Sequence, residues 1–122
     1  MILNRIWWLP IGNTPEITAE QLKEWLESGK LLQLIDSRTE LEYRQGTLSL
    51  AKHAPVSGLP AAIDRLKLDP KIPVIVLCLS GHRSLPGTRY LRSKGYEAYS
   101  LRGGLSTWKL KGYSLNKSHK HS

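Results

Sequence analysis

The sequence predicts an α/β fold in three layers, in which a parallel sheet of about five strands carries helices on both faces. Predicted strands and helices alternate along the chain, and this order favours parallel strands joined by crossover helices. The run 73–77, Pro-Val-Ile-Val-Leu, is apolar without alternation, which is typical of a strand buried on both faces. At 122 residues the chain is long enough for one domain with a single core.

Two capping boxes and two glycines define the helices of the first half. Thr18-Ala19-Glu20-Gln21 opens a helix that ends at Gly29, and Thr39-Glu40-Leu41-Glu42 opens a short helix that ends at Gly46. Apolar and β-branched runs predict the strands between the helices. In this half we predict strands at 31–35 and 51–56, and a third helix with an apolar face of Leu59, Ile63 and Leu66.

The second half repeats the alternation of strand and helix. A strand at 74–77 precedes a helix that Gly95 closes, and a strand at 96–101 follows. Gly103-Gly104 then turns the chain into a last helix that carries Trp108. Asp36, Cys78 and Arg102 each follow a predicted strand, and ligands of parallel sheets bind outside the carboxyl ends of the strands. We therefore expect these ends to form the functional rim.

The chain divides into an apolar arm at 1–13, a folded domain at 14–113 and a basic tail at 114–122. The arm contains Ile6-Trp7-Trp8-Leu9, which either packs on the domain or forms an interfacial patch. It is much shorter than the roughly 20 apolar residues that span a bilayer, and it lacks a signal-peptide pattern. The tail is polar and expected to be flexible, and its histidines show no designed metal site.

Cys78 is the only cysteine, and it directly follows the strand at 74–77. A loop between a strand end and a helix start presents backbone N–H groups, which favour the thiolate, the nucleophilic form of cysteine. The alternative is a buried cysteine that packs as a small apolar side chain. The residues after Cys78 are mostly small, polar or basic, and this composition favours the nucleophile.

Positive charge lies on the Cys78 side of the sequence. Residues 1–77 carry nine Lys/Arg and nine acids, whereas residues 78–122 carry nine Lys/Arg and one acid, so the second part holds the whole net charge of +8. A cationic environment favours a thiolate and attracts anionic substrates. The alternative is a solvated basic surface that only keeps the protein soluble.

Composition narrows the classes of function. A single cysteine excludes an intramolecular disulfide and a multi-cysteine zinc site, and it fits a reduced, cytoplasmic setting. We expect no metal, no cofactor and no transmembrane segment. Positive charge alone does not establish nucleic-acid binding, so we expect no specific nucleic-acid partner and a monomeric protein.

Four segments, in order, resemble motifs of the rhodanese (sulfurtransferase) family, over about residues 16–113. Each motif is weak alone, but four in order, with a strand before the cysteine loop and a helix after it, are specific. The family usually has Gly-His-Ile where this chain has Gly46-Thr47-Leu48. The segments are Leu34-Ile35-Asp36-Ser37-Arg38 for Asp-x-Arg, Glu42-Tyr43-Arg44-Gln45-Gly46 for Glu-[Phe/Tyr]-x-x-Gly, Cys78 to Ser84 for Cys-x-x-Gly-x-Arg-Ser, and Leu101 to Trp108 for Leu-x-Gly-Gly-[hydrophobic]-x-x-Trp.

The resemblance implies that Cys78 takes sulfane sulfur from thiosulfate or a persulfide and passes it to a thiol, a protein acceptor or cyanide. Arg83 would hold the anionic donor or orient the loop, and Ser84 would donate to the persulfide or cap the helix. His82 is expected to be solvated, and Asp36 and Arg38 to support the rim, either as a buried ion pair or as a cap. The implied active-site loop and substrate-binding residues are Leu79, Ser80, Gly81, His82, Arg83 and Ser84.

Two other functions compete with a sulfurtransferase. Related phosphatases place five residues between cysteine and arginine, whereas Cys78 and Arg83 enclose four, and the smaller loop suits a sulfur atom better than a phosphate. The second alternative is a sulfur carrier or a non-catalytic interaction and regulatory module. Cys78, Gly81, Arg83 and Ser84 together argue against an inert module, but they do not separate an enzyme from a carrier.

Overall fold

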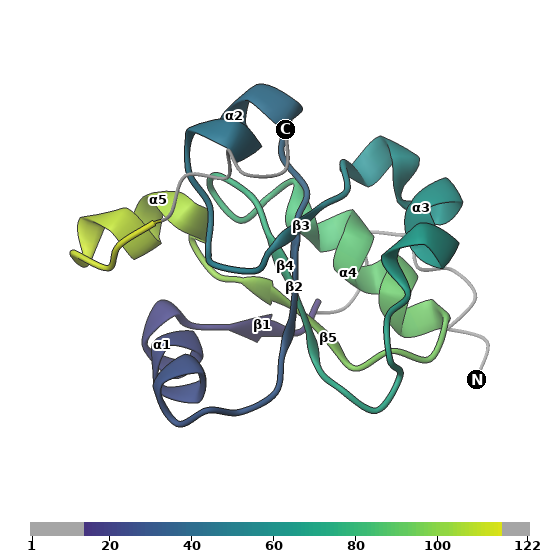
Figure 1. The fold of residues 1–122 in the computed structure, drawn as a ribbon, viewed down its shortest axis with the longest axis horizontal. Helices are drawn as coiled ribbons and strands as arrows, with labels where there is room; N and C mark the ends of the chain where they lie inside the picture. The colour runs from purple at the N-terminus through teal and green to yellow at the C-terminus, as the bar shows by residue number, and fades with distance from the viewer. Residues whose placement is uncertain (1–13, 116–122) are drawn as a thin grey trace.

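The computed structural model describes residues 14–115; the predicted arm at 1–13 and residues 116–122 of the predicted tail lie outside the described residues. Five parallel strands form one sheet in the order β1-β5-β4-β2-β3, which confirms the predicted architecture (Figure 1). The elements are β1 (Glu16–Ile17), α1 (Ala19–Glu27), β2 (Gln33–Asp36), α2 (Glu40–Gln45), β3 (Lys52–His53), η2 (Val56–Gly58), α3 (Leu59–Leu66), β4 (Val74–Leu77), α4 (Ser84–Ser93), β5 (Ala98–Leu101) and α5 (Gly104–Leu110).

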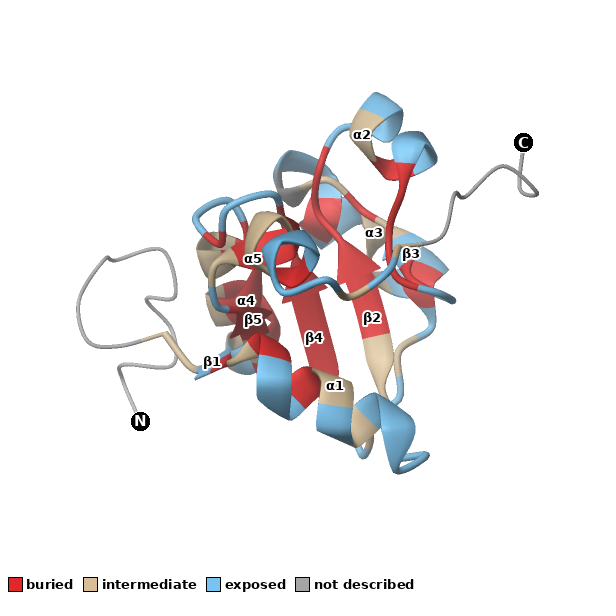
Figure 2. Cartoon of the chain, turned by 90° about the vertical axis from the view of Figure 1, so that its left-hand side faces the viewer, coloured by how far each residue is buried: buried red, intermediate tan, exposed pale blue. Residues whose placement is uncertain are grey.

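The central strand β4 divides the core into two apolar layers. Val74 and Val76 pack with α3 and α4, whereas Ile75 and Leu77 pack with α1 and α5. Successive side chains of a strand point to opposite faces, so a strand covered on both sides needs apolar residues at every position. Figure 1 shows α1 and α5 on one side of the sheet and α3 and α4 on the other, and Figure 2 shows β4 buried along its length.

Both predicted capping boxes are present. The Gln21 N–H donates to Thr18 Oγ1 at 3.1 Å, and the Thr18 N–H donates back to Gln21 Oε1 at 3.0 Å. At α2 the Glu42 N–H donates to Thr39 Oγ1 at 3.3 Å, and the Thr39 N–H donates to Glu42 Oε1 at 3.0 Å. Each box satisfies N–H groups that a helix start leaves without an intrahelical partner.

The edge strands differ from the prediction. The strand β1 was not predicted, and the strand predicted at 51–56 is limited to Lys52–His53. Strands of two residues have no detectable periodicity, and β1 exists because it pairs with β5, with Glu16 opposite Ser100. Pro55 has no N–H for a sheet, and the chain turns into η2 immediately after it.

A buried ion pair fixes the chain where β2 ends. Arg38 Nη2 donates to Asp36 Oδ2 at 2.8 Å, and its Nε donates to Oδ1 at 3.0 Å. The Thr47 hydroxyl donates to the same carboxylate at 2.7 Å, and Arg38 Nη2 also donates to the carbonyl of Gly46. Of the two predicted forms of support, an ion pair or a cap, the structure has the ion pair, which joins the end of β2 to the segment after α2.

We expect Asp36→Ala to lower the free energy of unfolding by about 3–5 kcal/mol, because it leaves the buried Arg38 guanidinium without a counter-charge. Urea denaturation measures this loss. Glu40→Ala is the matched control, because Glu40 pairs with Arg44 on the exposed face of α2 and its removal should cost less than about 1 kcal/mol. Equal losses in the two variants would contradict a structural role for the buried pair.

Candidate functional site

The thiol of Cys78 lies directly after β4, inside the loop that leads to α4. Cys78 is fully buried, and the Gly81 N–H donates to its Sγ at 2.8 Å. The Cys78 thiol and the Ser84 hydroxyl lie 3.5 Å apart, with the thiol as donor. Ser84 is also the first residue of α4. The thiol thus sits within reach of a backbone donor and a hydroxyl that could both stabilise negative charge on sulfur.

The first turn of α5 holds the start of this loop. The Leu105 N–H donates to the carbonyl of Cys78, and the Ser106 N–H donates to the carbonyl of Leu79, each at 2.8 Å. These N–H groups belong to the helix start, where no intrahelical acceptor exists. The two bonds turn the first carbonyl groups of the loop toward α5, while the Gly81 N–H faces the sulfur.

Two glycines permit this close approach of backbone segments. Gly81 has φ +94°, and a Cβ there would lie 2.9 Å from the Gly103 nitrogen. Gly104 has φ +64°, and a Cβ there would lie 2.4 Å from the Leu79 carbonyl oxygen. Both positions combine a left-handed backbone with a lack of space, so a larger residue is strained at either one. Gly81 of the cysteine motif and Gly104 of the last motif therefore both allow the Cys78 loop to pack against the start of α5.

A buried hydroxyl network between α4 and β5 supports the end of the Cys78 loop. The Thr88 hydroxyl donates to the Ser84 carbonyl at 2.8 Å, and Thr88 Oγ1 lies 2.6 Å from Ser100 Oγ. All three residues are fully buried. Neither Thr88 nor Ser100 was predicted as a site residue. The available signal was a threonine four residues after Ser84, the spacing at which a helical hydroxyl reaches a backbone carbonyl.

Arg83 pairs with a carboxylate that the sequence analysis placed only in a capping box and a family motif. Its Nη1 and Nη2 donate to Glu42 Oε1 and Oε2, each at 3.0 Å, so the two groups form a two-point contact between the loop and α2. The hydrogen bonds from Arg83, followed by those from Thr39, hold the pKa of Glu42 at about 2. The same pair raises the pKa of Arg83.

The other predicted loop residues form the outer surface. Leu79, Ser80 and His82 are exposed, and Ser80 Oγ lies 3.1 Å from His82 Nδ1. Asp36 and Arg38 lie at the same end of the sheet, where the backbone and hydroxyl of Ser37 both donate to the Leu77 carbonyl. Arg102 is exposed and pairs with Glu16 at 3.1 Å, on the β1 side of the rim.

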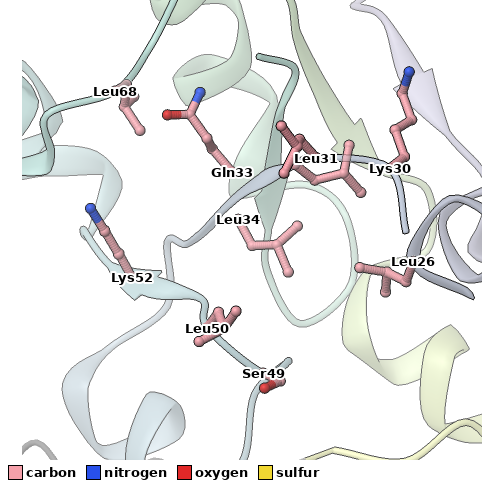
Figure 3. A pocket seen from close by; sticks show the side chains of 10 residues that line it. Leu26, Lys30, Leu31, Gln33, Leu34, Ser49, Leu50, Lys52 and Leu68 are labelled. Atoms are coloured by element: carbon pink, nitrogen blue, oxygen red, sulfur yellow. The ribbon is translucent and has the colours of Figure 1, made fainter. Parts of the chain in front are cut away.

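A hollow lies near the amino end of β2, and no residue of the Cys78 loop lines it. Figure 3 shows Leu26, Leu31, Leu34 and Leu50 around it, with Lys30 and Lys52 among the polar lining. Its volume is about 280 Å³. Because the chain has a single cysteine, this hollow offers no thiol for covalent chemistry.

Two further findings concern residues 14–115. Within this range no group of three or more His, Cys, Asp or Glu side chains is arranged to hold a metal ion. No helix in the same range has the length and apolar character needed to cross a membrane.

A family model described as Rhodanese-like domain matches residues 18–111. The chain belongs to this family. It is 33% identical over 94 residues to a protein of Allochromatium vinosum named Sulfurtransferase. The match covers 76% of this chain and 86% of the relative. A rhodanese-like domain protein from Staphylococcus aureus has a similar structure, with a TM-score of 0.75 and 28% identity over 86% of this chain and 99% of that one.

The rhodanese-like domain is also similar to part of a larger solved structure. A thiosulfate sulfurtransferase from Pseudomonas aeruginosa gives a TM-score of 0.78 and 29% identity, and the match covers 87% of this chain but only 21% of that chain. These likenesses agree with the resemblance that the sequence motifs indicated.

The Glu42–Arg83 pair of this rhodanese-like domain should give stability a defined pH dependence. The folded state lowers the pKa of Glu42 from 4.5 to about 2, so the pair stabilises the fold above about pH 4.5 and loses this contribution as the pH falls toward 2. The difference in unfolding free energy between the wild type and Glu42→Gln should be constant from pH 8 to about 5 and shrink below about pH 4.5. Urea denaturation at each pH measures it, and a difference that grows on acidification would contradict the pair.

Proposed function

We propose that this rhodanese-like domain is a sulfurtransferase that moves sulfane sulfur through a persulfide on Cys78. The observation that carries the proposal is the single thiol after β4, with the Gly81 N–H 2.8 Å from its sulfur. A backbone donor at this distance stabilises a thiolate before the reaction and a charged persulfide after it. The relative named Sulfurtransferase supports the same class of reaction.

In the first half-reaction the Cys78 thiolate attacks the outer sulfur of thiosulfate or of a persulfide. A new bond forms between Cys78 Sγ and that sulfur, while the sulfur–sulfur bond of the donor breaks. The electron pair of the broken bond leaves with sulfite or with the donor thiolate. This is covalent catalysis, in which one transfer is divided into two displacements.

In the second half-reaction an acceptor thiolate attacks the outer sulfur of the Cys78 persulfide. The acceptor leaves as a persulfide, and the Cys78 thiolate is restored. Cyanide replaces the thiol in an assay and leaves as thiocyanate. The alternative form of the proposal is a sulfur carrier, which uses the same steps but passes the sulfur to a protein. In both forms the donor is a small sulfur-containing anion, and the acceptor is a thiol or a protein.

The remaining residues have supporting roles in this proposal. Ser84 is placed to donate its hydroxyl to the sulfur once the thiol is deprotonated, and Thr88 fixes the turn that carries Ser84. Arg83 orients the loop through α2. Asp36 and Arg38 fix the neighbouring end of β2. We further propose that the protein acts as a monomer in the cytoplasm.

Incubation with thiosulfate should add about 32 Da to the wild-type protein, the mass of one sulfur atom bound to the Cys78 nucleophile. Intact-mass spectrometry measures the adduct, and a thiol reductant should remove it. Cys78→Ser should give neither the adduct nor cyanide-dependent thiocyanate. Thiocyanate formation by Cys78→Ser at the wild-type rate would exclude the mechanism.

A further inference from the structure

The mouth of the Cys78 loop carries an ion pair between Arg83 and Glu42. Arg83 is the one Lys or Arg between positions 78 and 84. Both of its terminal nitrogens donate to Glu42, and both carboxylate oxygens of Glu42 accept from it, at 3.0 Å. In this two-point geometry both terminal nitrogens of the arginine already donate to one carboxylate.

Glu42 is held in place independently of Arg83. Its Oε1 accepts from the Thr39 N–H at 3.0 Å and lies 3.1 Å from the Thr39 hydroxyl, as part of the capping box of α2. The negative charge is therefore fixed at the start of a helix, where a carboxylate is favourable. A donor that displaced it from Arg83 would leave Glu42 beside the loop without its main partner.

Two other arginines at this end of the sheet are also paired with acids. Arg38 is paired with Asp36, and Arg102 is paired with Glu16. A dianion that enters the loop therefore meets the repulsion of Glu42 together with the attraction of Arg83. Coulomb energy scales with the charge of the donor, so this repulsion acts twice as strongly on a dianion as on a monoanion.

The loop surface also offers an apolar contact. Leu79 directly follows Cys78 and is 42% exposed. An inorganic oxyanion gains nothing from such a side chain, whereas the carbon portion of an organic persulfide can pack against it. Charge and surface chemistry thus favour the same class of donor.

We propose that Glu42 is a specificity-determining residue: by pairing with Arg83 it selects organic persulfides of low charge over inorganic dianions such as thiosulfate as sulfur donors. This inference rests on the proposed persulfide chemistry at Cys78. The thiolate of Cys78 attacks the outer sulfur of R–S–SH, and the new Sγ–S bond forms as the donor S–S bond breaks. The electron pair leaves on R–S⁻, and the proton stays with the transferred sulfur, so no external oxidant or reductant is required.

Glu42→Gln tests the inference because it removes the negative charge and keeps a side chain that can cap α2. Gln21 occupies the equivalent position of the α1 capping box, so glutamine is compatible with this cap. Glu40→Gln is the matched control, because it removes one negative charge from the same helix at an exposed residue that pairs with Arg44. Melting temperatures of both variants verify that they are folded.

The measurement is the second-order rate constant for loading Cys78, obtained by rapid quench and mass spectrometry, with thiosulfate and with glutathione persulfide, whose R–S–SH form carries one net negative charge. Glu42→Gln should raise the thiosulfate constant on the order of tenfold and the constant for the monoanionic persulfide only about threefold, because the energy scales with charge. The excess for thiosulfate should shrink at 0.5 M salt, where screening is strong. Glu40→Gln should change neither constant by more than about twofold.

Three results would overturn the inference. These are an equal change for both donors, a fall in the thiosulfate constant, and a gain that does not respond to salt. Any of these results would mean that the Glu42–Arg83 pair only holds the loop in position and does not select the donor. A wild-type protein that is loaded by neither donor would instead exclude the proposed sulfurtransferase, so the two failures are distinguishable.

Discussion

The hydrogen bonds from the first turn of α5 to the carbonyl groups of Cys78 and Leu79 determine the shape of the whole candidate site. They require α5 to approach the loop so closely that Gly104 has no room for a Cβ. They also connect the loop after β4 to the turn after β5, and β4 and β5 are neighbouring strands in the sheet. The sulfur environment therefore depends on the packing of the sheet and not on the loop sequence alone.

Ion pairs across the molecule locally offset part of the charge asymmetry that is evident along the chain. Residues 78–122 hold the whole net charge of +8, yet three of their cations pair with acids from the first half: Arg83 with Glu42, Arg102 with Glu16, and Lys111 with Glu20. The pairs of Arg102 and Lys111 are exposed, and exposed pairs contribute little to stability. The Arg83–Glu42 pair lies beside the Cys78 loop, where a charge changes which donors are attracted.

The order of apolar runs, capping motifs and glycines in the sequence was sufficient to predict the layered fold, both capping boxes and the strand that precedes Cys78. It did not reveal β1, because two residues carry no pattern and this strand is formed by pairing with β5. The predicted strand ends placed Asp36, Cys78 and Arg102 at one rim, but the Arg83–Glu42 contact joins residues 41 positions apart, and no local pattern predicts it. The Ser84–Thr88–Ser100 network was hidden for a similar reason, since its members lie on α4 and β5 and meet only after folding.

The central claim is that sulfur resides on Cys78 between two separate displacements. A single-turnover measurement of sulfite release, with thiosulfate in excess and no acceptor present, tests this claim most directly. A covalent persulfide mechanism requires a burst of about one sulfite per protein molecule before any acceptor is added. Release of sulfite only in the presence of an acceptor would show direct transfer between the two substrates, and it would contradict the account.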